Sequence, residues 1–196
     1  AVSMPINQDP TLHELSELQQ TWLEATYGIE IITVDLTNLY EEFRISVPSS
    51  DLGYANSKAR LRMTALYGLA ADRDNLVVGT GNKVEDFGVG FFTKYGDGGV
   101  DISPIADLNK SEVYELAKEL RIPQKIQDAA PTDGLWYDGR TDEDQLGATY
   151  SELEWAMNYD GEMHLTEREA EILRIYREHR TSNMHKMVPI PVCKIK

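Results

Sequence analysis

Short apolar runs alternate with segments of helical periodicity along the chain. The runs AVSMPI (1–6), IEIITV (29–34) and LVV (76–78) have the length and apolar content of buried strands. Segments in which apolar residues recur every three or four positions separate these runs. Short buried strands that alternate with helices predict an α/β fold, here a doubly wound parallel sheet with helices on both faces.

Capping residues bound several of the expected helices. Asp9 and Pro10 begin one that Gly28 ends, and Asn109 with Glu112 begins another that runs to Leu120. Further helices are expected at 39–43, 56–71, from the acidic start 141–144, at 151–157, and after a Thr166–Glu169 capping box. Residues 48–51 are expected to form a loop and 187–196 an extended tail.

Length and charge narrow the class of protein. A chain of 196 residues, 41% of them hydrophobic, predicts a single domain over 1–196. Its net charge of −14 argues against nucleic acid and anionic membranes as partners, because its field repels both. No apolar run approaches the ~20 residues of a membrane span. The single cysteine, Cys193, excludes an internal disulfide. We expect a soluble, cytoplasmic protein.

A glycine-rich stretch, Gly79 to Asp101, is the candidate functional region. It holds 7 of the chain's 14 glycines, together with lysines, acids and threonines. Such density disfavours helix and strand, and is kept where backbone turns with positive φ or approaches a ligand closely. Thr80 follows the third expected strand, at the sheet edge where such folds bind ligands. The stretch therefore predicts a site for phosphate and magnesium.

The common nucleotide and catalytic fingerprints do not occur. GTGNKV begins like GxGxxG, but Val84 stands where the third glycine belongs, and the sequence has no GxxxxGK[ST], HExxH or GxSxG. A dinucleotide oxidoreductase is therefore disfavoured.

From the residues alone, each remaining candidate has two interpretations. Glu85 and Asp86 are either ligands of a hard cation or solvated carboxylates. Lys94 and Lys110 either hold phosphates or lie on a solvated face. Asp97 is equally suited to be a turn residue. Arg60 and Arg62 form either an anion site or a pair on the surface. His185 and Lys186 form either an anion site or a cap at the C-terminal end of a helix.

Several motifs resemble the NAD synthetase family. They are ANSKARLRM (55–63), VVGTGNKVED (77–86), GFFTKYGDGGVDISPIADLNK (90–110), AAPTDGLW (129–136), TDEDQLG (141–147) and MHK (184–186), in the family's order and spacing. The resemblance implies the doubly wound fold of the N-type ATP pyrophosphatases (adenine-nucleotide alpha-hydrolase-like) and a homodimer. It also implies a ligase that amidates deamido-NAD (nicotinic acid adenine dinucleotide) with ammonia and ATP, releasing AMP and pyrophosphate.

The resemblance also implies roles for individual residues. It implies ATP contacts at Thr80, Lys110 and Thr132, and a Mg²⁺ ligand at Glu85. It implies deamido-NAD contacts at Arg60, Lys94, Asp101, His185 and Lys186. Asp97 is implied to be a catalytic residue that handles ammonia or contacts a second magnesium ion.

One family motif does not occur in the sequence. The Ser-Gly-Gly-x-Asp-Ser loop, whose backbone holds pyrophosphate in the family, is absent, and the chain begins about where the family's second strand begins. We expect that the N-terminal strand and loop are missing from this chain, which by itself would then not adenylate. Residues 48–54 also match the family poorly. Two alternatives remain open: the synthetase domain of a glutamine-dependent enzyme, or a non-catalytic nucleotide-binding fragment.

Overall fold

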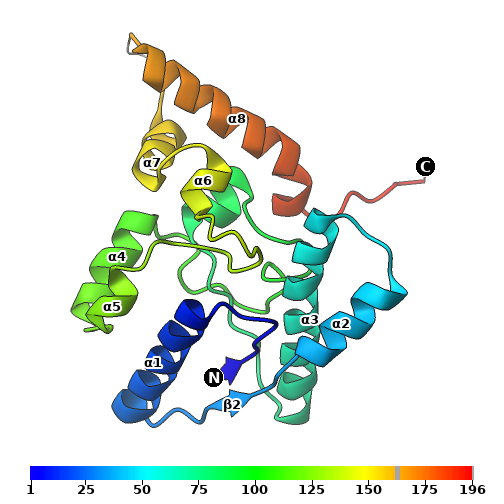
Figure 1. Cartoon of the computed structure of the whole chain (residues 1–196). Coiled ribbons are helices and arrows are strands. Elements are labelled where there is room, and N and C mark those ends of the chain that lie inside the picture. Colours follow the sequence, from blue (N-terminus) through cyan, green and yellow to red (C-terminus); the bar gives the residue numbers. More distant parts are fainter. Residues whose placement is uncertain (162–163, 196) are drawn as a thin grey trace.

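The computed structural model describes residues 1–161 and 164–195 and consists mainly of helices around short parallel strand pairs (Figure 1). The elements are β1 (Val2–Ser3), α1 (Pro10–Tyr27), β2 (Ile32–Thr33), α2 (Thr37–Ser46), α3 (Asp51–Asp72), the π-helical segment η1 (Lys83–Val89), α4 (Lys110–Glu119), α5 (Gln124–Gln127), α6 (Asp142–Leu146), α7 (Tyr150–Asn158) and α8 (Glu167–Met187).

The strand pairing is parallel, as an α/β fold requires. β1 pairs with β2, Val2 opposite Ile32, and Val78 makes an isolated parallel bridge to Ile102. α1 is the crossover between β1 and β2, and it is bounded as expected. Asp9 accepts hydrogen bonds from the first turn, and Gly28 ends the helix in the left-handed conformation. The α/β class is confirmed, but the strands are shorter than the apolar runs that predicted them.

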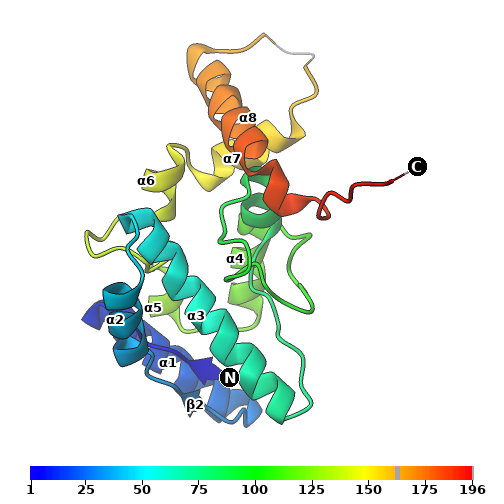
Figure 2. The ribbon, with the colours of Figure 1, turned by 90° about the vertical axis from the view of Figure 1, so that its right-hand side faces the viewer.

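α3 begins earlier than its sequence pattern indicates. The expected start at Asn56 is wrong by five residues, because Ser50 caps the helix by accepting a hydrogen bond from the Gly53 amide at 3.2 Å. The loop expected at 48–51 is therefore shorter than predicted, because Asp51 already belongs to α3. Figure 2 shows α3 running along the body of the molecule beside α2. The first half of α3 contacts the glycine-rich stretch, where Thr93 Oγ1 donates to Asn56 and Arg60 donates to the Lys94 carbonyl. Its C-terminal end lies near β2, where Arg73 pairs with Glu30.

Two clusters of buried side chains hold the described chain together. One joins Ile6, Leu36 and Tyr40 beside the β1–β2 pair. The other joins η1 to α7 and α8; its members are Val84, Val89, Leu146, Ala148, Tyr150, Leu153, Ala156, Ile172 and Leu173. Figure 1 shows α8 lying across α7, with the C-terminal tail leading away from the body. The second cluster fixes where η1 presents its polar side chains.

The glycine-rich stretch is partly helical, contrary to the expected effect of its glycines. Asn82 caps η1 by accepting from the amides of Val84 and Glu85, both at 3.0 Å. Among these glycines only Gly90 has a positive φ, 67°, and it ends η1. Elsewhere the missing Cβ permits close packing against the protein itself: a Cβ at Gly81 would lie 2.1 Å from the Asp86 carboxylate. The close approach that these glycines permit is therefore between segments of the same chain.

No helix in the described part of the chain is both long and apolar enough to cross a membrane.

Alanine substitutions at Gly90 and Gly28 distinguish the cost of backbone strain from the cost of steric crowding. Both have φ near 66–67°, but a Cβ at Gly90 would lie 2.5 Å from Asn183 Cβ, whereas one at Gly28 meets no described atom within 4 Å. We expect Gly28→Ala to cost about 1–2 kcal/mol of unfolding free energy, and Gly90→Ala a further ~1–3 kcal/mol from overpacking. Urea unfolding of both variants measures this. Equal losses would contradict the packing of α8 on Gly90.

Candidate functional site

Glu85, Lys110 and Tyr150 meet from three different elements. Glu85 lies on η1, Lys110 is the first residue of α4 and Tyr150 the first residue of α7. The Lys110 ammonium donates to Glu85 Oε1 at 2.9 Å, and the Tyr150 hydroxyl donates to the same oxygen at 2.6 Å. The Lys110 Nζ also lies 4.7 Å from the centroid of the Tyr150 ring. The predicted metal ligand and one predicted ATP contact are thus brought together.

Other acids surround this pair. The Tyr150 hydroxyl also donates to Asp142 Oδ2 at 3.1 Å. Burial raises the pKa of Asp142 to about 6, although its hydrogen bond from Tyr150 acts in the opposite direction. Burial, followed by the charge of Glu85, raises the pKa of Asp86 to about 6 as well. Acids this close keep the local potential negative, so the site favours a cation.

Glu85 fits a magnesium ion that is shared with a phosphate ligand. Both hydrogen bonds to its carboxylate fall on Oε1, and Oε2 accepts none from any described residue. Within residues 1–161 and 164–195, no three His, Cys, Asp or Glu side chains are grouped so as to hold a metal. Magnesium is commonly bound by one or two carboxylates together with substrate phosphates. The residues therefore suit a nucleotide-bound Mg²⁺ rather than a closed protein site.

A second group of predicted residues lies where α8 ends against the glycine-rich stretch. Lys94 Nζ donates to the His185 carbonyl at 2.6 Å, and Arg60 Nε donates to the Lys94 carbonyl at 3.3 Å. Lys186 Nζ donates to the carbonyls of Gly90 and Phe92 at 2.9 and 2.8 Å. Desolvation lowers the pKa of Lys186. Four of the five residues predicted to contact deamido-NAD are therefore neighbours.

The carboxylates of Asp97 and Asp101 accept hydrogen bonds from different parts of the chain. Asp97 is exposed as a residue, but its carboxylate accepts from the Thr93 amide at 3.0 Å, and desolvation is the largest influence that raises its pKa. Asp101 accepts from the Val77 amide at 2.8 Å and from the Tyr67 hydroxyl at 3.1 Å. The Asp101 side chain thus anchors the backbone at Val77 and makes no hydrogen bond to the Lys94–Lys186 group among the described residues.

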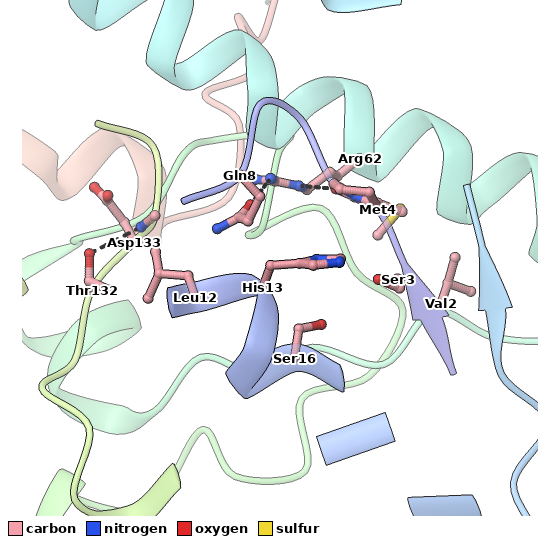
Figure 3. Close-up of a pocket in the computed structure, with 12 residues that line it drawn as sticks. Val2, Ser3, Met4, Gln8, Leu12, His13, Ser16, Arg62, Thr132 and Asp133 are labelled. Atoms are coloured by element: carbon pink, nitrogen blue, oxygen red, sulfur yellow. Dashed lines mark hydrogen bonds between the residues drawn. The ribbon is translucent and has the colours of Figure 1, made fainter. Parts of the chain in front are cut away.

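A cavity of about 350 Å³ lies between β1, α1, α3 and the loop at Thr132 (Figure 3). Arg62 lies on its wall and donates to the Met4 carbonyl at 3.0 Å and to Gln8 Oε1 at 3.3 Å. Desolvation lowers the pKa of Arg62. In the view of Figure 3, the labelled Thr132 lines the side opposite β1. Of the described residues to which the family resemblance gives a role, Thr132 alone lines this cavity, beside Arg62, a candidate anion contact.

The remaining predicted contact is Thr80, which is exposed and makes no side-chain hydrogen bond to a described residue. The structure also adds residues that the sequence did not single out for chemistry. Tyr150 was expected only near a helix start, and Asp142 only as part of an acidic one. The contact of Tyr150 with Glu85 spans 65 residues of sequence, so no local pattern indicates it.

Comparisons with known proteins agree with one another. The family model of NAD synthase matches residues 1–189. An NH(3)-dependent NAD(+) synthetase from Methanococcoides burtonii is 48% identical over 131 residues, 65% of this chain and 49% of that protein. One from Carboxydothermus hydrogenoformans is 37% identical over 191 residues, 94% of this chain and 74% of that protein. The chain spans about half the length of several curated relatives, such as those covered to 49% and 54%.

Solved structures give the same result. The structure of an NMN synthetase from Francisella tularensis superposes with a TM-score of 0.88 at 34% identity, and the match covers 100% of this chain and 78% of that one. An NH3-dependent NAD synthetase from Campylobacter jejuni superposes at a TM-score of 0.76 over 99% of this chain and 77% of its own; at 23% identity it shows the fold alone. Together with the match over residues 1–189, these findings establish that the chain belongs to the NAD synthase family.

Proposed function

We propose that the natural polypeptide containing these residues amidates deamido-NAD to NAD with ammonia and ATP, and releases AMP and pyrophosphate. The observation that carries the proposal is the Glu85–Lys110 pair, whose oxygen and nitrogen lie 2.9 Å apart in a chain of the NAD synthase family. The relatives from Methanococcoides burtonii and Carboxydothermus hydrogenoformans are NH(3)-dependent NAD(+) synthetases. A half-buried carboxylate beside an ammonium suits the charges of a magnesium–triphosphate ligand.

The chemistry has two steps, each of which needs charges to be held in place. A nicotinate carboxylate oxygen attacks the α-phosphorus of ATP, and the bond to pyrophosphate breaks. Ammonia then attacks the acyl carbon, loses a proton, and AMP leaves with the electron pair of the broken C–O bond. When bound, Mg²⁺ neutralises phosphate charge. We assign Lys110 the role of adding a positive charge beside the phosphates, and Thr80 and Thr132 the role of hydrogen-bonding contacts to ATP.

The dinucleotide is assigned to the second group. Arg60, Lys94, His185 and Lys186 lie together, and their cations match the anionic groups of deamido-NAD; Asp101 is assigned to it as well. The ammonium groups of Lys94 and Lys186 donate to main-chain carbonyls, so binding would exchange those bonds for bonds to the ligand. Asp97, whose pKa is raised, is assigned to ammonia, because a carboxylate with a raised pKa is a better proton acceptor.

The same proposal includes the finer expectations about the assembly. It describes a single domain that works as a homodimer, in the cytoplasm, where ATP and free nucleotides are available. It includes Mg²⁺ as the metal that Glu85 binds.

A second candidate substrate is supported by one comparison. The Francisella tularensis protein of similar structure is an NMN synthetase. Forming NMN in the same way would amidate the carboxylate of nicotinic acid mononucleotide, which lacks the adenylate half of deamido-NAD. The bond chemistry is unchanged, so the two candidates differ only in how much of the ligand the chain contacts.

The nitrogen source and the acyl substrate can be measured together. We expect the natural polypeptide to form NAD from deamido-NAD, ATP and ammonium, with one AMP for each NAD, and to form it far more slowly when glutamine replaces ammonium. Product chromatography with equal concentrations of deamido-NAD and nicotinic acid mononucleotide decides the substrate. Preference for the mononucleotide would select the second candidate. Amide formation from neither compound would contradict both.

Lys94 tests the assignment of the second group. We expect Lys94→Ala to raise the KM for deamido-NAD about tenfold or more, since a hydrogen bond to a charged group contributes about 1.5–3 kcal/mol. The KM for ATP should change less. Lys125→Ala is the matched control, because the one ion pair of Lys125 with a described residue is exposed and joins it to Glu14 at 3.2 Å. A larger effect on ATP than on deamido-NAD would reassign Lys94 to the ATP side.

A further inference from the structure

Tyr150 connects α7 to the Glu85–Lys110 pair through one buried hydroxyl. Both Tyr150 and Asp142 are 6% exposed. The hydroxyl lies 2.6 Å from Glu85 Oε1 and 3.1 Å from Asp142 Oδ2, so one hydrogen is shared between two carboxylate oxygens. The shorter contact is the one to Glu85. The phenol is thus held from both sides, and its stronger bond is directed at the predicted metal ligand.

Packing alone does not account for this arrangement. Tyr150 belongs to the buried cluster of η1, α7 and α8, where a phenylalanine ring would fill nearly the same space. Asp142 Oδ1 is buried without a hydrogen-bond partner in the described chain. A buried polar atom left unpaired costs about 1–3 kcal/mol. Asp142 and Tyr150 are therefore less favourable for core stability than apolar residues would be. Their presence points to a role at Glu85.

We propose that Tyr150 is a positioning residue for Glu85, and that Asp142 holds the Tyr150 hydroxyl in place. The inference rests on the proposed function, since it concerns the carboxylate assigned to magnesium. Tyr150 and Lys110 both bind Oε1, and this fixes the rotation of the carboxylate. Oε2 is then left as the oxygen that faces a ligand. Outer hydrogen bonds of this kind orient metal-binding carboxylates and typically contribute 10–100-fold to metal affinity.

The test measures metal binding directly. Mn²⁺ is titrated into the natural polypeptide at saturating ATP, and bound Mn²⁺ is determined by electron paramagnetic resonance. Four proteins are compared: wild type, Tyr150→Phe, Glu85→Gln and the control Tyr176→Phe. Tyr176 packs against the same buried cluster, so its variant reports the loss of a hydroxyl near this core. Thermal melts confirm that each variant is folded.

We expect Tyr150→Phe to weaken Mn²⁺ binding about tenfold, Glu85→Gln to weaken it at least as much, and Tyr176→Phe to leave it unchanged. In turnover assays the Mg²⁺ concentration for half-maximal rate should rise by the same factor for Tyr150→Phe, with an unchanged KM for deamido-NAD. Wild-type affinity in Tyr150→Phe would overturn the inference, as would wild-type Mn²⁺ binding that does not depend on Glu85. Glu85-dependent binding without amide formation would instead contradict the proposed function alone.

Discussion

The contact of three elements on one carboxylate oxygen, Glu85 Oε1, is the interaction on which the proposed site depends. Lys110 reaches it from α4 and Tyr150 from α7, while Glu85 itself is carried by η1. η1 is not free to move independently, because Val84 and Val89 are fully buried against α7 and α8. The position of the carboxylate is therefore set by core packing and by the two bonds to Oε1 together. A shift of η1, α4 or α7 would therefore change the position of this oxygen or its hydrogen bonds.

α8 stabilises the other half of the region in a different way. Lys186, Asn183 and Arg180 donate to main-chain carbonyls between Phe87 and Phe92, so one helix satisfies the backbone where η1 ends. Buried carbonyls left unpaired would be costly, and these side chains remove that cost. Lys186 is also assigned to the dinucleotide, so it has both a structural partner and a proposed ligand. Ligand phosphates would compete with the carbonyls for the same ammonium group.

How much the sequence predicts depends on how local the cause is. The Asp9, Asn109 and Thr166 caps act within one helical turn, and the structure confirms each of them. The α/β class follows from the alternation of short apolar runs and helical segments, and the match to the NAD synthase family was expected from the quoted motifs.

The start of α3 was predicted too late in the sequence, because its cap at Ser50 precedes the apolar periodicity. The helical segment η1 was missed because glycine propensity is overridden by burial of Val84 and Val89. Lys110 beside Glu85 agrees with the predicted roles, whereas Tyr150 and Asp142 depend on a contact between residues 65 apart, which no local pattern carries.

The central claim is that these residues belong to an enzyme that activates a carboxylate with ATP, and isotope exchange tests it most directly. Labelled pyrophosphate is incubated with ATP and the natural polypeptide, with or without deamido-NAD, in the absence of ammonia. Reversible adenylation predicts that label enters ATP only when deamido-NAD and Mg²⁺ are present. No exchange under these conditions, from folded protein that binds ATP, would contradict the account and leave a nucleotide-binding fragment.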